Sequence, residues 1–219
     1  MRAKPVTIAW VRGGFLALIL GAVCPAATGQ GTIVFQTPGQ PIYYGPVEGS
    51  HNLDLNGDGI TDYVLFFGIS RAGFTPPGIN SVGVDGADLV VPLNRGDLVS
   101  ANPSSLDPAY VWYDPQVDGS SAFLGGQNIF DGQYFYSGNW SGVDGFVGLR
   151  FQYEGTMHYG WMEIANSENV ASGQVLGWAY ETRPNTPIFA GAVPEPSTWA
   201  LLSAGGILFW LLGRGKRMV

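Results

Sequence analysis

Cysteine, lysine and helical periodicity are nearly absent from this chain of 219 residues. Its single cysteine, Cys24, has no partner for an intramolecular disulfide, so the fold must be stabilised by a packed core. Its only lysines, Lys4 and Lys216, lie near the two ends, and the region between them has none. Apolar residues at helical spacing are hard to find between residues 30 and 193, which argues against a helical domain.

The same central segment is strongly acidic. Four arginines stand against sixteen aspartates and glutamates, a formal charge of −12, whereas the whole chain carries −7. A surface of this sign repels nucleic acid and anionic headgroups, and no basic cluster interrupts it. The composition therefore excludes nucleic acid as a partner and favours cations and neutral polymers.

The first 29 residues have the features of a secretory signal peptide. Basic residues precede an apolar stretch at residues 15–23, and small residues favour cleavage after Gly29. Cleavage there would remove Cys24 with the peptide. A lipid anchor on Cys24 is the alternative, but Val23 and Gly21 do not fit the lipobox pattern.

A proline-containing box, an apolar stretch and a basic cluster follow one another over residues 193–219. Prolines hold the box extended, and a protease can bind an extended strand. Residues 198–212 are uncharged and mostly apolar, but as a helix they would cover about 22 Å of a hydrocarbon core of roughly 30 Å. The box is Val193, Pro194, Glu195, Pro196 and Ser197, and the basic residues that predict a cytoplasmic end for a membrane helix are Arg214, Lys216 and Arg217.

This order of box, apolar stretch and basic end resembles the PEP-CTERM tail of bacterial envelope proteins. The resemblance implies an exosortase, a membrane-embedded cysteine-protease-like enzyme, as a partner. It also implies transient anchoring in the inner membrane and delivery to the cell surface or extracellular matrix. The alternative is a buried C-terminal helix of a soluble domain, although a core helix rarely ends in such a basic cluster.

Short runs of aromatic and β-branched residues, separated by Gly, Pro, Asn and Asp, predict an all-β domain over residues 30–192. We expect an antiparallel, jelly-roll-like β-sandwich flanked by an N-terminal signal helix and a C-terminal transmembrane helix. The predicted strands are residues 32–36, 42–44, 63–69, 88–91, 110–113, 133–136, 146–153, 157–165, 175–181 and 188–190.

The clearest strand pair is a hairpin over residues 146–164 that turns at residues 154–156. Val147, Leu149 and Phe151 fall on one face of its first strand, with Arg150 on the other. Residues 63–67 are apolar without alternation, which predicts a strand covered on both faces. The segments HYGWMEI and GWAYETRPNTPIFAGAVPEPS, which begin at residues 158 and 177, resemble the closing strands of many PEP-CTERM ectodomains and imply a shared scaffold rather than an activity.

The sequence DLNGDGITD at residues 54–62 matches the first nine positions of a calcium-binding loop. Oxygen donors spaced by two along a tight turn can converge on a hard cation. The expected ligands of a structural Ca²⁺ ion are Asp54, Asn56, Asp58 and Asp62, with the backbone carbonyl of Ile60.

The loop is not an EF-hand, because Leu65 stands where the twelfth-position glutamate belongs and a strand follows it. It resembles the Asp-rich calcium loops of extracellular β-proteins. Burying three carboxylates in one loop costs free energy unless a cation compensates them. The alternative is an Asx-rich turn without metal, since Asn-Gly and Asp-Gly favour tight turns.

Catalytic patterns are weak. His51 and His158 are the only histidines, and no nucleophile motif accompanies them, so we expect no enzyme. Four tryptophans could stack on sugars, although aromatic rings more often fill a core. These are Trp112, Trp140, Trp161 and Trp178. The sequence thus predicts an exported structural or adhesive component, with a polysaccharide-binding module as the alternative and an enzyme third.

Overall fold

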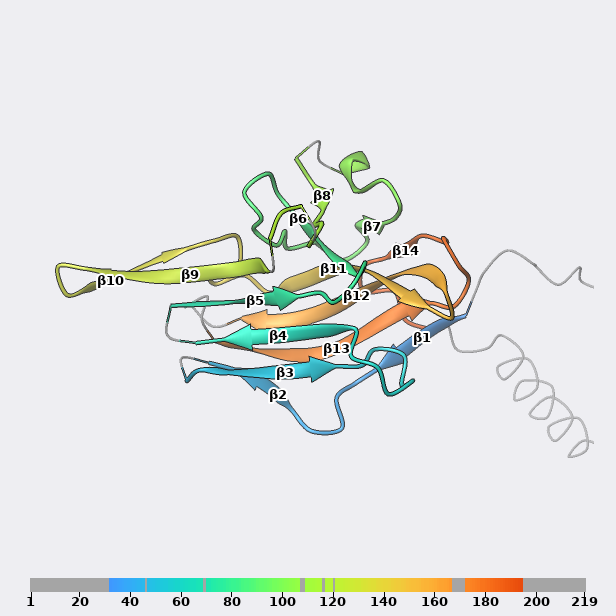
Figure 1. Ribbon diagram of the computed structural model, residues 1–219, viewed down its shortest axis with the longest axis horizontal. Helices are drawn as coiled ribbons and strands as arrows, with labels where there is room; N and C mark the ends of the chain where they lie inside the picture. The colour runs from blue at the N-terminus through green and yellow to red at the C-terminus, as the bar shows by residue number, and fades with distance from the viewer. Residues whose placement is uncertain are drawn as a thin grey trace, which may run out of the picture. The chain divides into compact units, whose positions relative to one another are not determined.

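The chain folds into antiparallel β-sheets, as Figure 1 shows. The computed structural model describes residues 32–194, except 46, 69, 107–108, 116, 120 and 167–171. All described residues belong to the compact unit Gly31–Val219. Their only helical element is the short 3₁₀ turn η1 (Pro103–Ser105). The all-β, antiparallel prediction is confirmed; the predicted signal and transmembrane helices lie outside the described residues.

The larger sheet has seven strands. Its order is β1-β13-β12-β11-β6-β8, with β2 also paired to β13. Long neighbours β11, β12 and β13 form its centre and pair antiparallel, with one register shift between β12 and β13 at Glu163/Ile164. The strands are β1 (Ile33–Gln36), β2 (Ile42–Tyr44), β6 (Ser81–Val84), β8 (Val111–Trp112), β11 (Gly145–Tyr153), β12 (Thr156–Asn166) and β13 (Gly173–Glu181).

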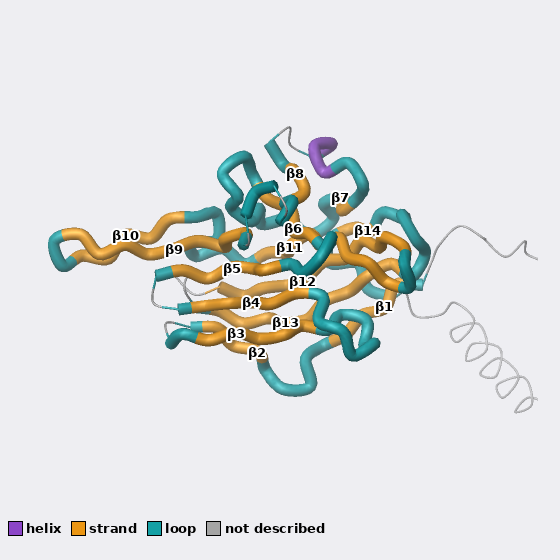
Figure 2. The backbone as a smooth tube through the Cα atoms, in the orientation of Figure 1, coloured by secondary structure: helices purple, strands orange, loops and turns teal. Residues whose placement is uncertain are grey.

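The second sheet has five strands in the order β10-β9-β5-β4-β3. In Figures 1 and 2 the β9–β10 hairpin extends beyond the ends of its neighbours. A separate small sheet pairs β14 (Ile188–Phe189) with β7 (Leu98–Val99). The five strands are β3 (Gly49–Leu53), β4 (Tyr63–Phe67), β5 (Arg71–Thr75), β9 (Ala122–Phe130) and β10 (Gln133–Ser137).

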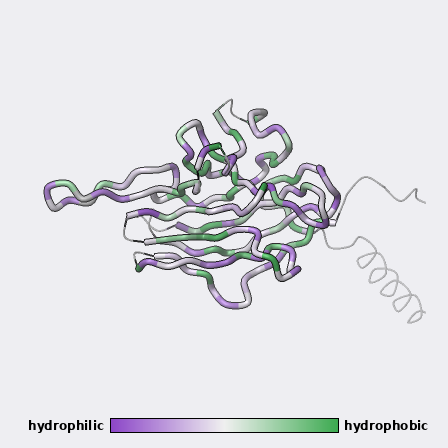
Figure 3. The backbone as a smooth tube through the Cα atoms, in the orientation of Figure 1, coloured by the Kyte–Doolittle hydropathy of each residue, from purple (hydrophilic) through white to green (hydrophobic). Residues whose placement is uncertain are grey.

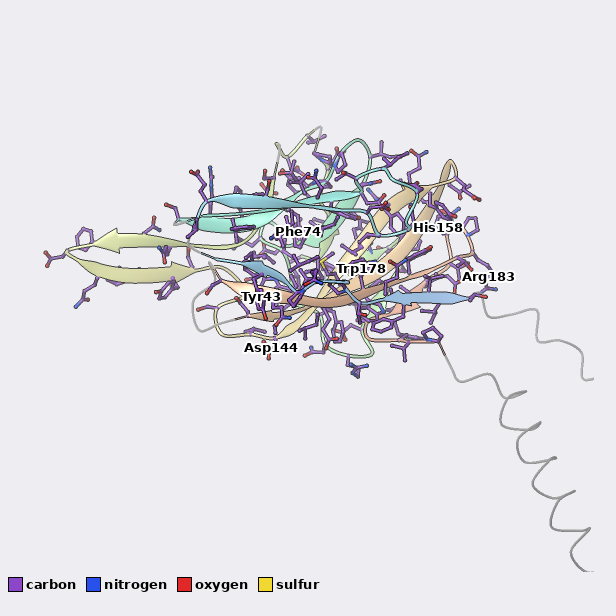
Figure 4. All side chains as sticks on the ribbon, turned by 90° about the horizontal axis from the view of Figure 1, so that it is seen from below. Tyr43, Phe74, Asp144, His158, Trp178 and Arg183 are labelled. Atoms are coloured by element: carbon purple, nitrogen blue, oxygen red, sulfur yellow. The ribbon has the colours of Figure 1, made fainter. Side chains whose placement is uncertain are left out.

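One hydrophobic core joins the two larger sheets. Leu65 and Phe74 from the five-stranded sheet lie in the same buried cluster as Leu149, Phe151 and Trp178 from the seven-stranded sheet. Figure 4 shows Phe74 and Trp178 between the two layers, and Figure 3 shows hydrophobic residues concentrated along the strands. The two sheets therefore pack face to face, and their shared core provides the stability that the single cysteine cannot.

A second core covers the opposite face of the seven-stranded sheet. Here Tyr110, Phe146 and Trp161 are buried together with Leu93 and Ile188 from the connecting segments. The sheet is thus buried on both faces, which explains why all four residues of β6 are buried although two of them must face away from the first core.

The predicted hairpin is confirmed, both in its position in the chain and in which of its side chains face the core. β11 pairs with β12 from Gly145↔Ile164 to Tyr153↔Thr156. Val147, Leu149 and Phe151 are fully buried in the first core. The turn consists of Glu154 and Gly155, both with positive φ (50° and 75°), so Thr156 begins β12 instead of completing the turn.

Consecutive strands lie side by side in part of each sheet, and the jelly-roll-like connectivity that we expected stays a prediction. Strands β3, β4 and β5 follow one another within one sheet, and so do β11, β12 and β13 in the other. These two runs are meanders, because each strand pairs with the next strand in the chain. Elsewhere successive strands cross between the two sheets, from β2 to β3, from β5 to β6, from β8 to β9 and from β10 to β11.

Strands β3, β5, β6, β7 and β9 were not predicted, and predicted strand 88–91 forms only isolated bridges at Leu89 and Val90. Glycine in β5, β6 and β9 and polar residues in β3 weaken the strand signal. Packing requires the glycines. A side chain at Gly83 would overlap the Tyr110 ring, and one at Gly73 would meet the Ala122 carbonyl oxygen.

Candidate functional site

A series of side-chain to backbone hydrogen bonds stabilises the acidic loop between β3 and β4. Asp54 accepts from the N–H groups of Gly57 (2.7 Å) and Gly59 (2.8 Å) through its two carboxylate oxygens. Asn56 Oδ1 accepts from Asp58 N at 2.9 Å, and Asp58 Oδ1 accepts from Ile60 N at 2.8 Å. The predicted ligand residues therefore wrap a tight turn, in which Gly57 and Gly59 adopt φ of 80° and 84°.

Asp62 closes the loop. Its Oδ2 accepts from Leu55 N at 2.8 Å, and its own N–H donates to Leu53 O at 2.8 Å. The side chain is buried, and burial raises its pKa to about 6, with further contributions from the carboxylates of Asp58 and Asp54. A negative charge at Asp62 is therefore costly in the fold without a compensating cation.

The loop brings all five predicted calcium ligands onto one turn, but it does not gather their carboxylates around one point. Within the described part of the chain, no group of three or more His, Cys, Asp or Glu side chains is close enough to hold a metal ion. Ile60 has only its backbone carbonyl to offer a cation, since its side chain is a hydrocarbon, and the residue is 68 % exposed. The donors are hard oxygens, which suit Ca²⁺.

Three of the four predicted sugar-stacking tryptophans are buried, which removes them as platforms. Trp140, Trp161 and Trp178 are 0 %, 1 % and 7 % exposed, and their indole N–H groups donate to the carbonyl oxygens of Val90 (3.0 Å), Ala192 (3.1 Å) and Leu55 (3.1 Å). They fill the cores because large rings contribute the most apolar area there.

Trp112 is half-buried, and its ring already has partners within the fold. It stacks on Tyr159 with ring centroids 6.1 Å apart, and the Arg150 guanidinium lies 5.3 Å from its centroid. Its N–H donates to Ser100 O at 3.1 Å. The four rings share no exposed face, so the structure does not support stacking of a sugar on them.

His158 is a packed residue. It is 2 % exposed, and its two ring nitrogens lie 2.8 Å from Glu181 O and 3.0 Å from Thr156 Oγ1. Figure 4 shows it on β12, close to the turn of the hairpin. His51, on β3, has Nε2 2.9 Å from Tyr43 O and packs against Phe67.

The outer face of the five-stranded sheet carries a groove that the sequence did not reveal. We expected β4 to be covered on both faces, but Phe66 on its outer face is only half-buried and borders a hollow of about 1140 Å³. Phe66 pairs with Gly73, which pairs with Phe123, so the three residues form one row across β4, β5 and β9. The two rings meet edge to face at 5.9 Å because Gly73 between them has no side chain.

The sorting box begins where the packed domain ends. The Trp161 indole N–H donates a hydrogen bond to the Ala192 carbonyl oxygen. The next two residues, Val193 and Pro194, are exposed. Glu195, Pro196, Ser197 and the basic residues Arg214, Lys216 and Arg217 lie outside the described residues. Among the described residues no helix is long and apolar enough to cross a membrane.

Residues 192–217 match the family model of the PEP-CTERM protein-sorting motif. The chain carries a PEP-CTERM sorting signal. It is therefore an exported protein directed to an exosortase-type sorting system, anchored in the membrane before it is processed. The PEP-CTERM motif covers the tail alone, and no curated protein and no solved structure matches the chain.

Proposed function

We propose that this PEP-CTERM protein is a structural or adhesive component of the cell surface or extracellular matrix, and that it has no enzymatic activity. The observation that carries the proposal is the position of the sorting motif. It begins at residue 192, directly after the last strand, and its first box residues are exposed. An exosortase-type enzyme would thus reach the box without unfolding the β-domain, and processing would release that domain intact.

The sorting step can be tested by replacing both Pro194 and Pro196 with alanine. We expect the variant to accumulate as a full-length, membrane-associated precursor, because an alanine pair no longer holds the extended conformation that a protease binds. Fractionation and immunoblotting measure the distribution. The matched control is Pro187→Ala, an exposed proline outside the motif. An unchanged distribution of the double variant would contradict processing at this box.

The acidic loop is the second part of the proposal. We infer that Asp54, Asn56, Asp58 and Asp62, with the Ile60 carbonyl, hold a structural Ca²⁺ ion. The proposal is supported by five oxygen donors on one turn and by the buried Asp62 carboxyl, whose pKa is raised by burial and by the charges of Asp58 and Asp54. The ion would offset their repulsion and fix the loop against the core, where Leu55 O accepts from the Trp178 indole.

Calcium is expected to raise the melting temperature of the protein. At a free concentration about 100 times the dissociation constant, the stabilisation amounts to roughly 2.7 kcal/mol. Thermal unfolding with added calcium and with chelator measures it. Asp58→Asn should abolish most of the shift, whereas Asp131→Asn, in the exposed turn between β9 and β10, should keep it. Equal melting temperatures with calcium and chelator would remove calcium from the proposal.

A further inference from the structure

The groove on the outer face of the five-stranded sheet has the composition of a ligand site. Its middle row is apolar, with Phe66 and Phe123 on either side of Gly73. Gly125 and Gly126 on β9 also line it, so backbone in place of side chains forms part of its floor. The surrounding lining contains neutral hydroxyl and amide side chains, namely Ser70, Thr75, Ser121, Gln127, Asn128 and Ser137.

The charged residues of the groove select against anionic ligands. Glu48, Asp88 and Asp118 line it together with a single cation, Arg71. This acidic balance, within a segment of formal charge −12, repels a polyanion. A cationic peptide is also disfavoured at the aromatic row, because the Arg71 guanidinium already lies 5.2 Å from the centroid of the Phe123 ring.

A ligand for this groove must therefore combine an apolar face with neutral hydrogen-bonding groups, and a sugar ring has both. A pyranose has an apolar C–H face, which can cover an aromatic ring, and hydroxyls at its edge, which can bond to amide, hydroxyl and guanidinium groups. Thr75 Oγ1 and Ser121 Oγ lie 3.0 Å apart at one side of the aromatic row. On its other side Arg71 pairs with Gly126, which pairs with Ser137. Hydrogen-bonding groups therefore flank the rings on both sides.

The size of the groove favours a polymer over a single sugar. Its volume of about 1140 Å³ exceeds the roughly 300–1,000 Å³ typical of small-molecule pockets. We propose that the groove binds a segment of a neutral polysaccharide, with Phe66 as the stacking surface and Arg71 as a hydrogen-bond donor to sugar hydroxyls. This inference is independent of the calcium loop and of the sorting step.

Binding is tested with the full-length chain, purified in detergent, against laminarin, xyloglucan and galactomannan as neutral probes. Alginate and polylysine serve as anionic and cationic probes. We expect affinity for at least one neutral glycan, measured by calorimetry, and a loss of tenfold or more in Phe66→Ala and Arg71→Ala. Phe189→Ala is the matched control, since Phe189 is 56 % exposed on β14, outside the groove.

Hydrogen exchange on the unaltered protein supplies a readout that does not depend on a variant. A bound glycan should protect the amides of β4, β5 and β9, which line the groove, and leave β12 unchanged. No binding to any neutral probe, binding that survives both groove substitutions in folded variants, or binding of polylysine or alginate alone would each overturn the proposal.

Discussion

Replacing Trp140 with alanine is expected to lower the free energy of unfolding by about 3–5 kcal/mol. The side chain is 0 % exposed in the first core, so the substitution leaves a cavity that the rigid sheets fill only in part. It also removes the hydrogen bond from the indole to Val90 O (3.0 Å). A domain of this size is stabilised by only about 5–15 kcal/mol, so the variant should be marginally folded. Chemical denaturation, followed by circular dichroism, measures the loss.

Two variants separate the contributions to this loss. Trp140→Phe keeps most of the apolar volume but leaves Val90 O without the indole donor, and we expect a loss of about 1–3 kcal/mol. Phe130→Ala removes an aromatic ring that is 75 % exposed at the end of β9, and its effect should lie within about 0.5 kcal/mol of zero. A Trp140→Ala protein as stable as Phe130→Ala would contradict the core assignment.

Alkaline pH is expected to unfold this protein steeply. Burial raises the pKa of Tyr63 well above its ordinary value, and it also raises the pKa of Tyr44 and Tyr110. Above about pH 10 these groups lose their protons in the unfolded chain but keep them in the folded protein. The unfolded state then binds fewer protons, so stability falls as pH rises, by about 1.4 kcal/mol per pH unit for each tyrosine.

Denaturation midpoints between pH 8 and 12 measure this dependence. Tyr63→Phe should reduce the slope by less than about one third, because burial also raises the pKa of Tyr113, Tyr159 and Tyr180 beside those of Tyr44 and Tyr110. At neutral pH the same variant should lose about 1–3 kcal/mol, since the Tyr63 hydroxyl donates to the carbonyl pair Ser81 O (3.0 Å) and Arg150 O (2.9 Å). The control is Tyr43→Phe, which alters a tyrosine that is 60 % exposed. If the denaturation midpoint of the unaltered protein stayed constant between pH 8 and 12, the explanation by buried tyrosines would be refuted.

Local patterns predicted the elements that depend on neighbouring residues. Alternation along residues 146–153 was enough to predict the β11–β12 hairpin and its buried face, because a strand places every second side chain on one side. The spacing of Asp54, Asn56 and Asp58 predicted a tight turn, and each of these side chains accepts a hydrogen bond from the loop backbone. The residues of the tail identified the sorting signal directly.

Strands with weak local signals escaped prediction for a physical reason. β5 reads Arg-Ala-Gly-Phe-Thr, and its glycine lowers strand propensity when taken alone. In the fold, the same glycine leaves the space that brings Phe66 and Phe123 together. Phe66 and Phe123 are far apart in the chain, so no local pattern could place them in one groove.

For the tryptophans, too, the sequence left the interpretation open and the tertiary structure decided it. Their residue type left two interpretations open, a sugar platform or a core, and only the packing of the sheets decided that Trp140, Trp161 and Trp178 are buried. By itself the sequence determined the C-terminal sorting signal, the acidic charge, the β class and the tight acidic turn, since each of these depends on composition or on adjacent residues. The tertiary structure alone decided the strand order, the two cores and the groove, because these depend on which distant strands pair and which face each presents.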